Sequence, residues 1–266
     1  MHFVEAQYLH AAGMALQKVA PAVWPDCRYP WENAMVHVMA HVEGETLARR
    51  ILRDAAFDAV RPKLARQCGA AMAGIHKADT SAIADFKVVD GPAQLAQFRE
   101  RYLSYDQPKP VFELAFAWLK ERLTAPRQVT LVHGDFRNGN IMVSPESGLA
   151  AVLDWELAHL GDPLEDLGWA LDPLWSSDRA HPGGMLTREA AIAVWEKASG
   201  LKADPKALAW WSMFASFKGA AIWISSAKEF QAATNTDPVM AFSGLYCLPF
   251  HNKRLADMLL QAREAS

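Results

Sequence analysis

Three polar residues, Asp135, Asn140 and Asp154, stand at the ends of apolar runs in the 266-residue sequence. Asp135 and Asn140 are five residues apart in one polar loop, and Asp154 ends the next apolar run. An aspartate can orient an acceptor hydroxyl and take up its proton, while carboxylate and carboxamide oxygens are ligands that Mg²⁺ prefers. These residue types at this spacing suit phosphoryl transfer, in which the protein mainly positions the reactants and the metal ion.

His133 precedes Asp135 by two residues, so the loop reads H-x-D-x-x-x-x-N, the pattern of a kinase catalytic loop. Such a spacing alone is a weak signal, because it arises by chance in many chains. The second aspartate, placed at the end of a predicted strand, and the Gly-Asp-Pro run at residues 161–163 argue against coincidence. A structural loop with satisfied polar groups is the alternative interpretation.

The motifs HGD…N, DWE and GDPLEDLG, at residues 133–140, 154–156 and 161–168, carry a resemblance to a known family. The sequence resembles the aminoglycoside phosphotransferase and choline kinase-like group of small-molecule kinases, and most of all its acyl-CoA dehydrogenase-associated branch. Residues 38–44 look like the family's hinge strand and turn, and the whole resemblance runs from about Glu5 to the C-terminus. It implies a protein kinase-like fold that uses ATP and Mg²⁺.

The resemblance implies that Asp135 is the catalytic base and that Asn140 and Asp154 are Mg²⁺ ligands. It also implies that backbone groups of Met39, Ala40 and His41 bind the adenine.

Four further residues are accessory candidates. His133 is expected to orient the loop through a backbone hydrogen bond rather than to exchange protons. Arg137 is either a phosphate or acceptor ligand or a solvated loop arginine, and Glu156 either contacts Mg²⁺ or substrate or forms a salt bridge. For Asp166 we expect a buried hydrogen bond to the catalytic loop.

The elements that must position these residues follow from periodicity. Predicted strands at residues 128–133 and 148–153 bracket the polar loop, which suggests a hairpin with the loop between its strands. Apolar residues recur at helical spacing in six other segments: 53–77, 111–123, 164–171, 188–198, 205–227 and 250–265. The predicted fold class is therefore α+β, dominated by helix.

The N-terminal part departs from the family. Only 38 residues precede Met39, and they include no glycine-rich turn. Their single lysine, Lys18, follows a short helix that the spacing of apolar residues predicts at residues 4–16. We expect residues 1–44 to be a remnant of the N-terminal lobe with the hinge, and residues 45–266 to be the helical C-terminal lobe with the catalytic loop. Either the sequence is truncated, or the protein is a relative with impaired nucleotide binding.

Composition excludes several classes of protein. The 27 Lys and Arg residues nearly balance 30 Asp and Glu, so no nucleic-acid partner is expected. No apolar stretch is long enough to span a membrane, no signal peptide is evident, and three distant cysteines do not form a disulfide framework, which favours a cytoplasmic protein without a membrane partner. Nothing in the sequence specifies an oligomeric state.

Two functions remain open. The first is an ATP- and Mg²⁺-dependent phosphotransferase acting on a hydroxyl of a small molecule. Its acceptor could be a hydroxyacyl-CoA-like compound, because residues 201–266 hold five acidic and seven basic residues, too few carboxylates for a polycationic acceptor. The second is a catalytically silent kinase-like binding protein that lacks the phosphate-binding lobe.

Overall fold

The computed structural model describes residues 41–83, 88–123, 125, 128–176 and 185–264, together with the backbone of residues 29–31 and 34–36. The chain divides into two compact units. Unit 1 comprises Met1–Val88 and Arg127–Ala203, and unit 2 comprises Val89–Pro126 and Asp204–Ser266. Most of the predicted segment 1–44 lies outside the described residues, so its assignment as a lobe remnant and hinge stays a prediction.

The described part of unit 1 holds short strands and four α-helices. Its strands are β1 (Tyr29–Trp31), β2 (Ala34–Val36), β3 (Thr130–Val132), β4 (Ile141–Ser144), β5 (Gly148–Val152) and β6 (His159–Gly161). Its α-helices are α2 (Ala48–Arg53), α3 (Arg61–His76), α6 (Leu164–Ala170) and α7 (Arg188–Ser199). The predicted helical segments 164–171 and 188–198 are confirmed within one residue at each end.

The predicted hairpin between residues 128–133 and 148–153 is wrong. β3 pairs instead with β6, antiparallel, with Leu131 opposite Leu160. β5 pairs with β4, a strand that the sequence reading missed, and Ile141 lies opposite Val152. The physical reason is that the polar loop after β3 runs directly into β4, whose alternating burial and nearby turn form a tighter local hairpin with β5.

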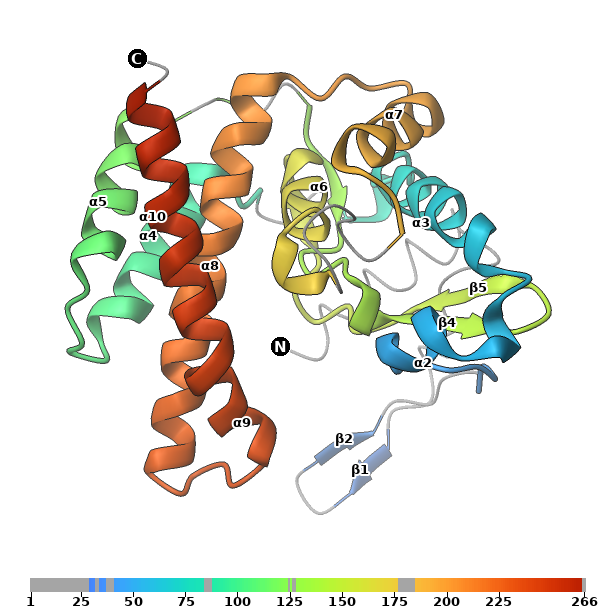
Figure 1. The fold of residues 1–266 in the computed structure, drawn as a ribbon, viewed down its shortest axis with the longest axis horizontal. Coiled ribbons are helices and arrows are strands. Elements are labelled where there is room, and N and C mark those ends of the chain that lie inside the picture. Colours follow the sequence, from blue (N-terminus) through green and yellow to red (C-terminus); the bar gives the residue numbers. More distant parts are fainter. Residues whose placement is uncertain are drawn as a thin grey trace. The chain divides into compact units, whose positions relative to one another are not determined.

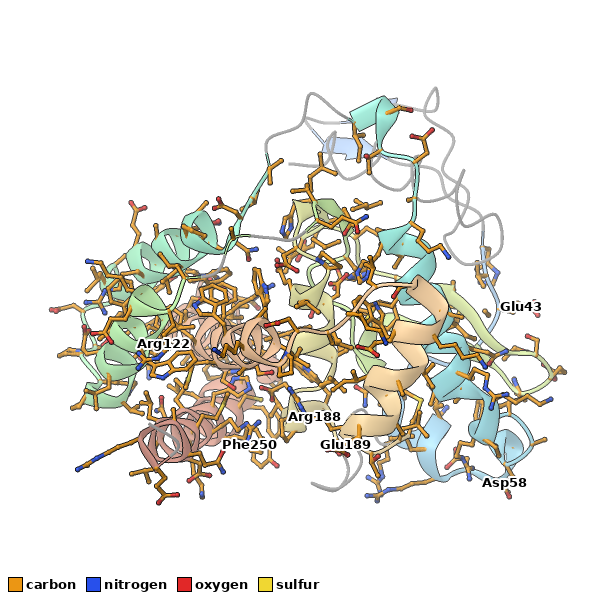
Figure 2. The ribbon with its side chains drawn as sticks, turned by 90° about the horizontal axis from the view of Figure 1, so that it is seen from above. Glu43, Asp58, Arg122, Arg188, Glu189 and Phe250 are labelled. Atoms are coloured by element: carbon orange, nitrogen blue, oxygen red, sulfur yellow. The ribbon has the colours of Figure 1, made fainter. Side chains whose placement is uncertain are left out.

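Helix α3 and helix α7 lie side by side in unit 1 (Figure 1). Pro62 lies in the first turn of α3, where its missing N–H is not needed. Asp58 lies at the edge of the unit (Figure 2). It forms an ion pair with Arg61 at 2.6 Å. The buried face of α3 includes Leu64, Met72 and Ile75, as its period predicts. These apolar contacts fix α3 within unit 1, the unit that also holds the catalytic loop.

Unit 2 is made of helices in the described residues: α4 (Gly91–Leu103), α5 (Pro110–Glu121), α8 (Pro205–Gln231), α9 (Pro238–Phe242), a π-helical turn (Ser243–Cys247) and α10 (Leu248–Glu264). α10 packs along α8 and α5 (Figure 1). Phe112 of α5 lies with its ring centroid 4.0 Å from those of both Tyr102 and Phe217. Trp210 and Trp211 of α8 are buried and belong to the core of unit 2.

Short strands and predominant helix make this an α+β fold, as predicted. Among the described helices, none combines the length and the hydropathy that crossing a membrane would require. The cytoplasmic location stays a prediction.

Candidate active site

The loop from His133 to Asn140 joins β3 to β4 and carries the predicted catalytic base. Gly134 has a φ of +79°, and a Cβ atom there would lie 2.4 Å from the carbonyl oxygen of Leu157. Only glycine combines this left-handed conformation with such a close approach. The loop therefore passes tightly over the Leu157 backbone and directs Asp135 from a fixed turn.

Three donors hold the Asp135 carboxylate. Asn140 Nδ2 donates to Oδ2 at 2.6 Å, while Trp169 Nε1 and Arg137 Nε donate to Oδ1 at 2.5 and 3.2 Å. The Asp135 side chain is 15% exposed, so it remains within reach of a ligand. Three hydrogen bonds to its two oxygens fix the direction of the carboxylate.

Asn140 and Asp154 lie at the same end of the β4–β5 hairpin. Leu153 N donates to the Asn140 carbonyl oxygen at 2.8 Å, and Asp154 follows at once in a left-handed conformation with a φ of +64°. The Asn140 carboxamide oxygen accepts no hydrogen bond from the described residues, and the exposed Asp154 carboxylate forms none with them. Two hard oxygen ligands are thus left available together, a donor set that fits Mg²⁺.

His133 is buried and bridges the loop to β5. Its Nδ1 accepts from Asp135 N at 3.2 Å, so the proton is on Nε2, which donates to the Leu153 carbonyl oxygen at 2.9 Å. Burial lowers the pKa of His133, against the opposing influence of the neighbouring carboxylates. The backbone hydrogen bond expected for His133 is present, and these contacts describe a neutral, orienting imidazole.

Asp166 is fully buried and accepts two backbone N–H groups of the loop. His133 N and Gly134 N donate to its two carboxylate oxygens, each at 2.8 Å. His76 Nε2 of α3 donates to Asp166 Oδ2 at 3.1 Å, and Trp195 Nε1 of α7 donates to His76 Nδ1 at 3.0 Å. Burial raises the pKa of Asp166, but the hydrogen bonds from the His76 side chain and the His133 backbone outweigh it and bring this pKa to about 2.

The other accessory candidates are placed as follows. The guanidinium of Arg137 lies over the Trp175 ring at 4.9 Å from its centroid, and it is partly exposed. Glu156 is exposed in the turn before β6, and His41 is exposed in a segment without regular structure. Met39 and Ala40 fall outside the described residues, so the adenine site stays a prediction.

Trp169, His76 and Trp195 are site residues that the sequence reading did not assign. Trp169 contacts Asp135 across 34 residues, and Trp195 reaches His76 across 119. No spacing rule links residues so far apart in the chain. The only available signals were the tryptophan directly after the GDPLEDLG motif and the histidine that ends an amphipathic helix.

Comparison with known proteins assigns the family. Residues 4–211 match the Phosphotransferase enzyme family. The chain belongs to this family.

A curated relative of this phosphotransferase is "Acyl-CoA dehydrogenase family member 11" of Gallus gallus, 34% identical over 145 residues, which cover 50% of this chain and 18% of the relative. The chain thus spans about a fifth of that protein.

Solved structures share the fold at low identity. A Ralstonia eutropha protein assigned to the aminoglycoside phosphotransferases has a TM-score of 0.78 and 19% identity, with 97% of this chain and 83% of the other covered. A thermostable mutant of aminoglycoside phosphotransferase APH(4)-Ia, in ternary complex with ADP and hygromycin B, has a TM-score of 0.66 and 15% identity, with 97% and 82% covered. The kinase-like fold predicted from the sequence is confirmed.

Proposed function

We propose that this phosphotransferase transfers the γ-phosphoryl group of ATP, with Mg²⁺, to a hydroxyl group of a small molecule. The observation that carries the proposal is the Asp135 carboxylate, held by Asn140, Trp169 and Arg137. Family membership supports phosphoryl transfer as the reaction class. ATP is supported by the ADP in the structure of the related APH(4)-Ia.

In the proposed reaction the acceptor oxygen attacks the γ-phosphorus. A new oxygen–phosphorus bond forms while the bond between the γ-phosphorus and the β,γ-bridging oxygen breaks, and ADP leaves. The hydroxyl proton passes to the Asp135 carboxylate, which Trp169 and Asn140 hold in direction. A general base of this kind contributes typically about 10² to 10⁴ in rate.

Asn140 and Asp154 are the residues that would hold Mg²⁺, through one carboxamide and one carboxylate oxygen. When bound, the ion neutralises charge on the phosphate oxygens. The protein's own contribution is the β4–β5 hairpin, because the hydrogen bond from Leu153 N to the Asn140 carbonyl ties the two ligands to one strand end.

For the acceptor we propose a neutral or anionic hydroxylated molecule with apolar surface, such as a hydroxyacyl-CoA-like compound. Residues 201–266 carry seven basic and five acidic residues, and a polycationic acceptor would need more carboxylates to replace its lost hydration. The curated relative's name, an acyl-CoA dehydrogenase family member, points in the same direction.

A competition assay tests the acceptor. The protein is incubated with MgATP and equal concentrations of a 4-hydroxyacyl-CoA and kanamycin, and phosphorylated products are separated by mass spectrometry. We expect the thioester to be phosphorylated preferentially. Preferential phosphorylation of kanamycin would overturn the acceptor assignment. Binding of MgATP and acceptor without any phosphorylated product would instead support the alternative of a catalytically silent binding protein.

A further inference from the structure

A small cavity lies in unit 1 between α3, α6, α7 and the catalytic loop. Its volume is about 80 Å³, and its walls are mainly apolar. The wall residues that matter here are Cys68, Met72, Phe136, Leu167, Met185 and Trp195. Protein interiors are normally packed to crystal density, so a space of this size between helices that otherwise pack closely needs a cause.

The cavity persists because its walls are fixed by other contacts. Trp195 forms one wall and is held by the hydrogen bond to His76, which is itself held by Asp166. α3 and α7 also touch directly, because a Cβ atom on Gly69 would lie 2.5 Å from Val194 Cγ1. Buried hydrogen bonds cannot shift without leaving their partners unpaired, so the helices cannot close over the space.

The cavity adjoins the catalytic loop in two ways. Phe136, Arg137 and Asn138 line it directly, and they stand between Asp135 and Asn140 in sequence. Trp195 connects it indirectly, through His76 and Asp166, to the backbone N–H groups of the loop. A molecule in this cavity would contact both the loop residues that line it and Trp195, which is linked to the loop by hydrogen bonds.

We propose that this cavity is a binding site for a short unbranched aliphatic chain with one polar end group, and that its occupation is felt by the catalytic loop. Its volume is about half of the roughly 150 Å³ of an apolar cavity that takes the six carbons of benzene, which corresponds to a chain of about three carbons. The Arg137 guanidinium is the donor for the polar end. Cys68 adds no charge, because burial raises the pKa of its thiol to about 12.

Two methionines make the proposal directly observable, since Met72 and Met185 both line the cavity. The full chain is labelled with ¹³C at the methionine methyls and ¹⁵N at the backbone and indoles, then titrated with primary alcohols from 1-propanol to 1-octanol. We expect saturable shifts of the Met72 and Met185 methyls and of the Trp195 indole N–H. Affinity should be greatest near 1-propanol and 1-butanol and should fall for longer chains. Met213 and the Trp210 indole, both in unit 2, serve as internal references.

A matched pair of substitutions on α7 tests the location. Ala191 lines the cavity, whereas Ala193 on the same helix is exposed. Ala191→Leu should lower the affinity for 1-butanol at least tenfold, and Ala193→Leu should leave it within twofold. If Ala191→Leu does not fold, Ala170→Leu, from the α6 wall, replaces it. Absence of saturable shifts, or equal binding in the cavity-filling and control variants, would overturn the site.

The coupling to the catalytic loop has its own readout. The amide N–H signals of His133 and Gly134, which donate to Asp166, should shift together with the Trp195 indole as 1-butanol binds. Binding without movement of these two amides would overturn the coupling. Neither measurement requires phosphoryl transfer, so the site is tested whether or not the proposed function holds.

Discussion

Asp135 is the residue on which the proposed phosphoryl transfer depends. Its carboxylate receives N–H groups from the loop itself, through Arg137 and Asn140, and from α6, through Trp169. The Trp169 bond is the most informative, because an indole can only donate and because it comes from another element. The site is thus organised around acceptor oxygens of Asp135 that are held in a fixed direction.

Asp135→Asn should reduce phosphoryl transfer by about 10² or more while the protein stays folded, because the amide keeps the size of the side chain but cannot accept the proton. Initial rates and thermal melts of the variant and the native protein check this. The exposed carboxylate of Asp58 provides the control, since Asp58→Asn should leave the rate unchanged. Activity of Asp135→Asn within tenfold of the native value would remove Asp135 from the role of base.

Because His133 is buried, we expect the folded protein to lose stability in mild acid. Burial lowers the pKa of His133, so the native state resists a proton that the unfolded chain accepts below about pH 6.5. The unfolded state then binds more protons, so the free energy of unfolding decreases as the pH decreases, by at most about 1.4 kcal/mol per pH unit. Denaturant titrations at pH 7, 6 and 5 should show a weaker dependence in His133→Gln than in the control His41→Gln, which changes an exposed histidine. Equal slopes in both variants would contradict it.

Asp166 acts in a lower pH window. Its folded pKa of about 2 lies below the ordinary value near 3.9, so its ionised form stabilises the fold above about pH 4. That stabilisation is lost as the pH falls from about 4 to about 2, and the effect of His133 is separable because it begins near neutrality.

At the scale of elements, the turn after β3 is determined by one close approach. Gly134 and Gly200 have almost the same backbone conformation, with φ of +79° and +78°. A Cβ atom on Gly134 would meet the Leu157 carbonyl oxygen at 2.4 Å, whereas one on Gly200 meets nothing within 4 Å. The two glycines therefore separate backbone strain from steric overlap.

Gly200→Ala should destabilise the protein by about 1 to 2 kcal/mol, the penalty of a left-handed non-glycine residue. Gly134→Ala should lose at least about 3 kcal/mol, because the added methyl also collides with backbone. Urea unfolding of the two variants measures the difference. Similar losses at both positions would show that the loop can move away from Leu157, contrary to the tight turn described here.

The network from α7 through α3 and α6 to the loop makes a second element-scale prediction. Trp195→Phe removes the N–H that His76 Nδ1 accepts, and Trp210→Phe removes an equivalent buried N–H that donates to Leu119 O at 2.9 Å in unit 2. Each should lose about 1 to 3 kcal/mol of stability. Only Trp195→Phe should also lower kcat, with KM little changed, because only Trp195 is connected to the loop. Equal kcat losses in both variants would assign Trp195 a purely structural role.

The sequence predicted α3, α5, α7, α8 and α10, because each carries an apolar face at helical spacing, as on α3 with Leu64, Met72 and Ile75. The helix predicted from residue 53 begins only at Arg61. The sequence did not predict α4 or the pairing of β3 with β6. Strands of three residues carry too little pattern to choose a partner, and that choice is made by tertiary contacts. The loop motif located Asp135 and Asn140 because they lie five residues apart in one segment of the sequence. Trp169 and Trp195 come from distant segments and reach the site only through folding.

At the scale of the whole molecule, the described residues of the candidate site all belong to unit 1, from His76 to Trp195. Unit 2 contributes the helices whose charge balance underlies the proposed choice of acceptor. Family membership covers residues 4–211 and so includes every described site residue. The central claim is therefore phosphoryl transfer at Asp135, and direct competition between acceptors tests the choice of substrate.

The most direct test of that claim follows phosphorus itself. The protein is mixed with MgATP and a pool of hydroxylated acyl thioesters and small alcohols, and the ³¹P NMR spectrum is recorded over time beside that of Asp135→Asn. We expect a phosphate monoester resonance that grows in equal amount with ADP in the native protein and is absent in the variant. ATP consumption that yields only inorganic phosphate, or a monoester that forms equally fast in Asp135→Asn, would contradict the assignment of this site as a phosphotransferase centre built on Asp135.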